Sequence, residues 1–83
     1  MTRAAKRDAS EPGIIAALER SGCMVYQMDR PVDLMVYRAR RLYLLEVKSK
    51  GGSLTDDQEE FLAAGWPVTV VWSPEQALTA VGL

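Results

Sequence analysis

The chain has 83 residues, of which 48% are hydrophobic and 25% are charged, and its formal net charge is -1. These values describe an ordinary globular domain and argue against a generally basic nucleic-acid binder, because phosphate neutralisation is the usual source of that affinity. The chain contains no histidine, which excludes His-metal nucleases, Ser-His and Cys-His nucleophiles and His-containing zinc sites. Any hydrolysis would have to use carboxylates, lysine and a hard cation such as Mg²⁺ or Mn²⁺.

A domain this small buries only about 60% of the surface of its unfolded chain, so we expect it to gain stability by forming a homodimer. The single cysteine, Cys23, cannot form an internal disulfide and is expected to be a small buried apolar residue. No run approaches the length of a membrane span, and no apolar segment follows the basic N-terminus. We therefore expect a soluble, cytoplasmic protein with a basic flexible tail over residues 1–10 and one domain over residues 11–83.

Helix and strand signals follow one another along the whole domain. Ser10 is expected to cap the first helix, and Thr55 with Gln58 forms a capping box for the second helix. The predicted elements, in chain order, are a helix over 11–21, strands over 24–28, 32–37 and 42–48, a helix between Thr55 and Gly65, a strand over 67–72 and a short helix from Pro74.

This αβββαβα order predicts an α/β fold with a mixed four-stranded sheet flanked by helices. Three strands would form an antiparallel meander, and the fourth would pair parallel to the third through a crossover helix. The sequence leaves open whether the first and second helices cover opposite faces or flank the sheet unevenly. We interpret the acidic residues that open the second helix as structural, since the helix macrodipole favours them there: Asp56, Asp57, Glu59 and Glu60.

The two middle strands form a predicted hairpin around the segment Arg38-Ala39-Arg40-Arg41. If the loop is symmetric about the Ala39-Arg40 bond, Asp33 lies directly opposite Glu46, whereas a three- or five-residue loop would shift the pairing by one. Side chains two apart in a strand share a face, so Glu46 and Lys48 would share that of Asp33.

Two opposed carboxylates repel each other unless a positive charge lies between them, and a divalent cation would relieve that repulsion. Asp33, Glu46 and Lys48 would then offer a metal cradle and a positive donor, as metal-dependent phosphodiester cleavage requires. The alternative is a Glu and a Lys on a solvated strand face.

Several segments around these residues occur in an order that resembles the virus-type replication-repair nuclease (VRR-NUC) domain, a branch of the PD-(D/E)XK nuclease superfamily. The segments are Pro31-Val32-Asp33-Leu34, Leu45-Glu46-Val47-Lys48, Gly51-Gly52-Ser53-Leu54-Thr55 with Gln58, and Ala64-Gly65-Trp66-Pro67-Val68. The resemblance covers most of the chain from Glu11 to Leu78 and is to the small stand-alone versions found in phages. The chain departs from the family's glycine-then-Pro-Asp pattern, since Val32 stands between Pro31 and Asp33.

The resemblance implies a PD-(D/E)XK (restriction-endonuclease-like) core and a DNA endonuclease that depends on Mg²⁺ or Mn²⁺. It implies catalytic roles for Asp33, Glu46, Lys48 and Gln58. It also implies a cation held by Asp33, Glu46, Glu11 and the backbone carbonyl of Val47. Glu11 equally fits an acidic residue that serves the helix dipole, and the capping box accounts locally for Gln58.

The positive residues that we expect to contact DNA are Arg38, Arg40 and Arg41 at the hairpin tip and Lys50 beside the site. A solvated turn is the alternative for the tip arginines. We expect a structure-selective enzyme that acts on branched DNA, as a Holliday-junction resolvase does, in DNA repair. The alternatives are a non-catalytic PD-(D/E)XK-fold module that binds nucleic acid or oligomerises, and a small partner-binding protein; metal titration separates them from the enzyme.

Overall fold

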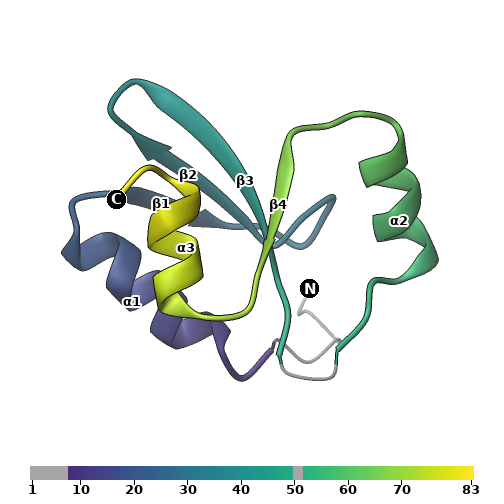
Figure 1. The fold of residues 1–83 in the computed structure, drawn as a ribbon, viewed down its shortest axis with the longest axis horizontal. Helices are drawn as coiled ribbons and strands as arrows, with labels where there is room; N and C mark the ends of the chain where they lie inside the picture. The colour runs from purple at the N-terminus through teal and green to yellow at the C-terminus, as the bar shows by residue number, and fades with distance from the viewer. Residues whose placement is uncertain (1–7, 50–51) are drawn as a thin grey trace.

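The protein folds as a mixed four-stranded sheet with helices on both faces (Figure 1). The computed structural model describes residues 8–49 and 52–83. The elements are α1 (Glu11–Arg20), β1 (Met24–Gln27), β2 (Leu34–Arg38), β3 (Arg41–Val47), α2 (Asp56–Ala63), β4 (Val68–Val71) and α3 (Pro74–Ala80). The strand order is β1-β2-β3-β4, with β1, β2 and β3 antiparallel and β4 parallel to β3, which confirms the predicted meander and crossover.

A two-residue turn joins β2 to β3 and fixes their register. Arg38 pairs with Arg41, so only Ala39 and Arg40 lie outside the ladder. Both have positive φ, 51° and 65°, as a type I′ hairpin turn requires. The loop is therefore symmetric about the Ala39-Arg40 bond, and the expected register is confirmed.

The start of α1 differs from the prediction that Ser10 caps the helix. Ser10 itself has helical backbone angles, φ −78° and ψ −15°, and its side chain makes no capping hydrogen bond. A capping side chain needs an extended residue to reach the first free amides. The Ser10 hydroxyl instead lies 3.3 Å from the carbonyl oxygen of Lys48, to which it donates.

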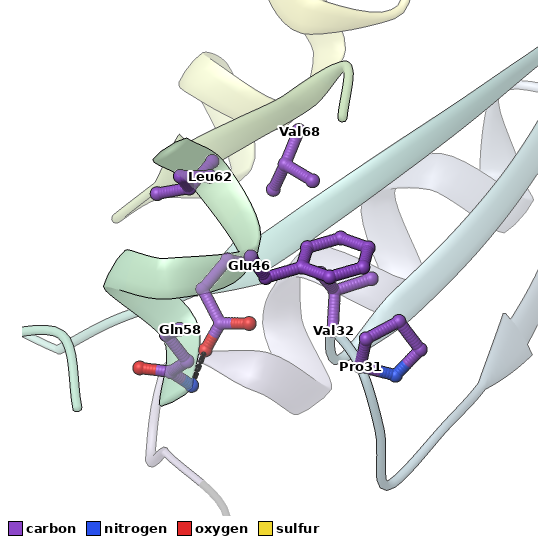
Figure 2. Close-up of a pocket in the computed structure, with 7 residues that line it drawn as sticks. Pro31, Val32, Glu46, Gln58, Leu62 and Val68 are labelled. Carbon is purple, nitrogen blue, oxygen red and sulfur yellow. Dashed lines mark hydrogen bonds between the residues drawn. The ribbon is translucent and has the colours of Figure 1, made fainter. Parts of the chain in front are cut away.

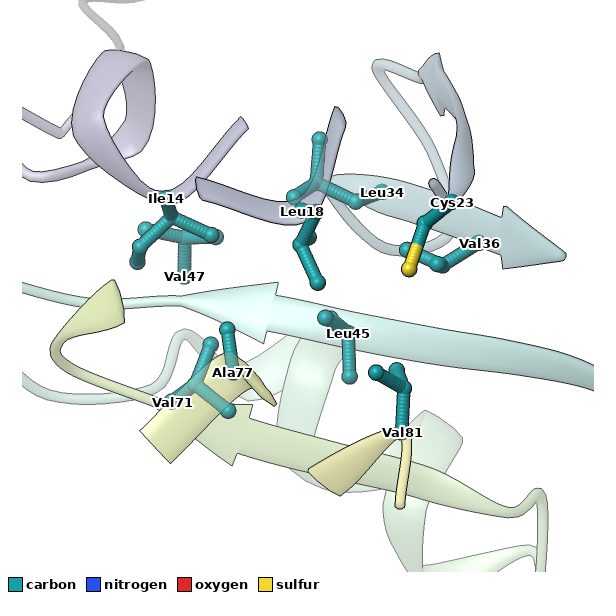
Figure 3. Packing of buried hydrophobic residues seen from close by; sticks show 10 residues of the cluster. All are labelled: Ile14, Leu18, Cys23, Leu34, Val36, Leu45, Val47, Val71, Ala77 and Val81. Atoms are coloured by element: carbon teal, nitrogen blue, oxygen red, sulfur yellow. The ribbon is translucent and has the colours of Figure 1, made fainter. Parts of the chain in front are cut away.

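The hydrophobic core lies between the sheet and the two helices α1 and α3, which cover the same face (Figures 1 and 3). Ile14 and Leu18 of α1 and Val81 after α3 are fully buried against alternate residues of the strands, such as Leu34 and Leu45. Cys23 belongs to this cluster, which confirms its expected burial.

The helix α2 lies on the opposite face of the sheet from α1 and α3, which answers the question that the sequence left open (Figure 1). The predicted capping box of Thr55 and Gln58 is present at its start. Its apolar residues Phe61 and Leu62 are only partly buried, and the helix contains no fully buried residue. None of the described helices is long and apolar enough to cross a membrane.

Candidate active site

The hairpin register brings Asp33 and Glu46 to opposed positions. Leu34 pairs with Leu45, and Asp33 and Glu46 are the next residues outward from that pair. Leu45 faces the core, so Glu46 points to the other face, toward α2. The prediction that these two carboxylates lie opposite each other is therefore confirmed.

Glu46 is almost completely enclosed, with only 2% of its surface exposed. Its Oε2 atom accepts a hydrogen bond from Nε2 of Gln58 (Figure 2). The same oxygen lies 3.6 Å from the ammonium of Lys48, whose side chain is 12% exposed. The other oxygen, Oε1, is buried and has no hydrogen-bond partner. A buried carboxylate oxygen without a donor is costly, so this atom is placed to accept a cation or a proton.

Burial is the main cause that raises the pKa of Glu46 to about 8, well above its ordinary value. The hydrogen-bonding contact and negative charge of Asp33 raise this pKa further, while the nearby charge of Lys48 lowers it. One lysine therefore does not offset the combined cost of burial and of a second carboxylate. The site favours either a proton on Glu46 or an additional positive charge between the two carboxylates.

Asp33 is held in place by the strand that carries Glu46. Its Oδ2 atom accepts a hydrogen bond of 2.8 Å from the backbone amide of Val47. This bond fixes the aspartate against β3, although Asp33 itself precedes the first residue of β2. The carbonyl of Val47, which the resemblance implies as a ligand, stays a prediction.

Gln58 joins the two sides of the site. Its amide oxygen accepts from the backbone amide of Thr55 at 2.9 Å and its own backbone amide donates to the Thr55 hydroxyl at 3.2 Å, which completes the capping box. Its side-chain nitrogen is thereby turned toward Glu46. The capping box is confirmed, and it orients the amide that contacts the Glu46 carboxylate. A catalytic role of Gln58 stays a prediction.

A small, mostly apolar hollow lies beside the Glu46 carboxylate, between the sheet and α2 (Figure 2). Figure 2 shows Glu46 and Gln58 at one end of this hollow. The remaining lining residues are Pro31, Val32, Phe61, Leu62 and Val68. Its apolar walls limit water around the carboxylate, in agreement with the raised pKa of Glu46.

Glu11 is buried at the start of α1, with 1% of its surface exposed. Its Oε2 atom accepts a hydrogen bond of 3.0 Å from Nε2 of Gln27, a residue that sequence reasoning missed. Gln27 is exposed at the end of β1, on the strand face that it shares with the partly buried Val25. Within residues 8–49 and 52–83, no three acidic, histidine or cysteine side chains are close enough together to form a ready metal cluster. Glu11 as a ligand of the cation stays a prediction.

The start of α1 is nevertheless tied to the strand that carries the site. Besides the bond from the Ser10 hydroxyl to the Lys48 carbonyl, the backbone amide of Ser49 donates to Oδ1 of Asp8 at 3.1 Å. These two bonds join residues about forty positions apart in the chain. They hold the segment that precedes Glu11 against the end of β3.

The expected DNA-contacting residues are not equivalent in the structure. Arg38 donates to the carbonyl oxygen of Val81 at 2.9 Å, so its guanidinium is bound to the C-terminal end of α3. Arg40 and Arg41 are exposed at the hairpin tip. Lys50 and the basic residues of the N-terminus lie outside the described residues. DNA binding by any of them stays a prediction.

The donor set fits a hard divalent cation in its chemistry. Asp33 and Glu46 supply carboxylate oxygens, and Oε1 of Glu46 has no protein donor. Comparisons of the chain with protein-family models, with curated proteins and with solved structures find no match. A functional assignment therefore rests on the residues and geometry of the site.

Proposed function

We propose that the protein is a metal-dependent DNA endonuclease of the PD-(D/E)XK type. The observation that carries the proposal is the buried Glu46, opposite Asp33, with Lys48 and Gln58 both on its Oε2 atom and nothing donating to its Oε1 atom. Most buried polar atoms in folded proteins have a hydrogen-bond partner, so an orphaned carboxylate oxygen at 2% exposure favours a bound cation or proton over a purely structural ion pair.

Each residue has a distinct role in the proposed reaction. Asp33 and Glu46 would hold Mg²⁺ or Mn²⁺, which polarises the scissile phosphate and lowers the pKa of the attacking water. Lys48, on the same strand face as Glu46, would orient that water and stabilise negative charge on the phosphate. Gln58 would keep the Glu46 carboxylate in one orientation, because the capping box already fixes its own amide.

The proposed substrate is branched DNA such as a four-way junction. This part rests on the resemblance of the sequence motifs to stand-alone VRR-NUC domains and on the two exposed arginines at the hairpin tip. Because the net charge of the chain is -1, affinity for DNA would have to come from a local group of basic residues. Contacts between these residues and phosphates would make DNA binding weaker as the salt concentration rises.

Cleavage of a panel of DNAs tests the proposal. Four-way junction, flap, nicked and linear duplex substrates are incubated with the wild-type protein in Mg²⁺, in Mn²⁺ and in EDTA. We expect metal-dependent nicking that Asp33→Asn and Glu46→Gln abolish, and that Glu59→Gln, which removes an exposed carboxylate from α2, leaves unchanged. Metal-independent cleavage, or cleavage by Glu46→Gln at the wild-type rate, would overturn the proposed site.

A thermal-unfolding experiment separates an enzyme from a module that has lost metal binding. A ligand that binds only the folded state raises its stability by about 2.7 kcal/mol at a hundred times its dissociation constant. We expect Mn²⁺ to raise the melting temperature of the wild type and of Glu59→Gln, but not that of Glu46→Gln.

A further inference from the structure

Trp72 is an exposed aromatic residue directly after β4, at the same edge of the sheet as Lys48. β4 runs parallel to β3, and Val71 pairs with Val47. The backbone amide of Lys48 donates to the carbonyl oxygen of Val71 at 3.0 Å, which extends the pairing by one residue and sets Trp72 beside Lys48. Val47 and Val71 are buried in the core, so the next residue of each strand belongs to the other face, where Glu46 lies.

This position is close to the candidate active site. Adjacent strands are about 4.8 Å apart and two residues along a strand span about 6.7 Å, so the Cα atoms of Trp72 and Glu46 are about 8 Å apart. Glu46 is buried between the sheet and α2, whereas Trp72 is 45% exposed. A nucleotide whose phosphate approaches the carboxylates from this edge would bring its own base, or that of its neighbour, to Trp72.

The backbone of Trp72 is fixed by the start of α3. Its amide donates to the side-chain oxygen of Gln76 at 2.6 Å, and the backbone amide of Gln76 donates to the hydroxyl of Ser73 at 3.2 Å. Only the two side-chain torsions of Trp72 are then left to be ordered by a ligand. A tryptophan on a fixed backbone therefore supplies a large contact area at a low cost in conformational entropy.

The other tryptophan of the chain, Trp66, has a different environment. It lies before the start of β4, at the opposite end of that strand from Trp72, and is 55% exposed. Its ring stacks on Phe61, with the ring centroids 5.3 Å apart and an interplanar angle of 2°. Within residues 8–49 and 52–83, no other aromatic ring stacks on Trp72. Trp72 therefore offers an unstacked aromatic surface beside the site, whereas one face of Trp66 is already covered.

We infer that Trp72 stacks on a nucleobase of the DNA strand that the candidate active site holds, an inference that rests on the proposed function. Every base has a π face, so such stacking tolerates any sequence. A base inside a continuous duplex already has a neighbour on each face, and unstacking it costs free energy. The base on Trp72 is therefore an unpaired one, or one at a break in the duplex. This gives the selectivity for branched DNA a physical cause, in which Lys48 meets the phosphate and Trp72 the base.

The two tryptophans allow a spectroscopic test of this contact. Trp66→Phe leaves Trp72 as the only indole, and Trp72→Phe leaves Trp66. Both are made in a Glu46→Gln background, so that the DNA stays intact, and are titrated in Mg²⁺ with three DNAs. These are a duplex with a single-stranded flap, the same duplex with an abasic flap, and the duplex without a flap. Anisotropy of a labelled DNA follows binding independently. We expect the base-bearing flap to quench Trp72 but not Trp66, and the other two DNAs to quench neither.

Substitution of the indole tests its contribution to binding. Trp72→Ala should weaken binding of the base-bearing flap by about 5- to 100-fold, and binding of the abasic flap much less. Trp72→Tyr should retain most of the affinity because it keeps an aromatic ring, and the matched control Trp66→Ala should leave the affinity unchanged. In the cleaving protein, Trp72→Ala should raise KM and leave kcat nearly unchanged, since the base is stacked equally in the ground state and the transition state. A structural role would instead lower the free energy of unfolding, which urea unfolding measures.

Equal quenching of Trp66 and Trp72 would overturn the inference, as would a folded Trp72→Ala variant that binds the base-bearing flap as tightly as Trp66→Ala. DNA that binds by anisotropy without changing the fluorescence of Trp72 would also overturn it, while the proposed nuclease would stand. Quenching of Trp72 by DNA that the wild type does not cut would refute the proposed cleavage and leave the base-stacking site in place. DNA that binds none of the variants would refute both.

Discussion

Replacement of Glu46 by glutamine should stabilise the metal-free protein at neutral and alkaline pH. Burial raises the pKa of Glu46 from 4.5 to about 8, with Asp33 adding to the effect and Lys48 opposing it. At low pH the carboxyl is protonated in both the folded and the unfolded chain. As the pH rises from 4.5 toward 8, the unfolded chain loses this proton first, so the folded state loses stability, and above about 8 the loss is complete.

The size of the effect follows from the interval between the two pKa values. At about 1.36 kcal/mol for each pKa unit, the interval from 4.5 to about 8 corresponds to on the order of 5 kcal/mol. Local relaxation and water entry reduce this, so we expect a gain of about 2 to 5 kcal/mol for Glu46→Gln. A domain of this length has a total free energy of unfolding of about 4 to 12 kcal/mol, so the gain is a large part of it.

Urea unfolding in EDTA at about pH 5, 7 and 9 measures the free energy of unfolding of the wild type, Glu46→Gln and Glu59→Gln. The advantage of Glu46→Gln over the wild type should be small at the lowest pH and grow to its full value at the highest. Glu59→Gln removes an exposed charge and should follow the wild type within about 0.5 kcal/mol at every pH. If Glu46→Gln is no more stable than the wild type at the highest pH, or its advantage does not grow with pH, the electrostatic reasoning is refuted.

Three further predictions concern the neighbours of Glu46 and the hairpin. Lys48→Ala should lower the rate of single-turnover cleavage by about 100- to 1,000-fold, which is the usual cost of removing one electrostatic donor. The rise in melting temperature with Mn²⁺ measures metal binding by the same variant. Gln58→Ala and Thr55→Ala both remove the capping box, at a cost of about 1 kcal/mol. Gln58→Ala should lower the free energy of unfolding further, because only this substitution removes the donor to Oε2 of Glu46. Urea unfolding of the two variants measures the difference. Ala39→Asn with Arg40→Gly should stabilise the protein by about 0.5 to 1 kcal/mol, since both positions have positive φ and this turn type favours Asn-Gly; an unchanged urea midpoint would contradict the turn assignment.

The hairpin at the centre of the site could be predicted from sequence because its register depends on local chemistry. Apolar strands on either side of Arg38-Ala39-Arg40-Arg41 leave few loop lengths, and the two-residue loop alone makes Asp33 face Glu46. The same holds for the capping box, where Thr55 and Gln58 lie three residues apart. Such features are determined within one or two adjacent elements, so periodicity and turn chemistry are sufficient.

Contacts between distant segments could not be predicted in the same way. Arg38 was expected to be free for DNA, but it binds the carbonyl of Val81, forty-three residues away. Ser10 was expected to cap its own helix, but its hydroxyl reaches Lys48 instead. Both contacts depend on how α1 and α3 pack on the sheet, and a sequence pattern does not specify that packing. The face covered by α2 was undetermined for the same reason.

The direction of the Glu46 pKa distinguishes a structural ion pair from a site that lacks a positive charge. In an ion pair that serves stability, the lysine would hold the pKa of the glutamate below its usual value, and the pair would stabilise the fold at neutral pH. Here Lys48 lies 3.6 Å from Oε2, yet the pKa of Glu46 is raised, because burial and Asp33 outweigh it. The buried Oε1 atom without a partner leads to the same conclusion from geometry alone. The proposed cation between Asp33 and Glu46 would remove both costs together.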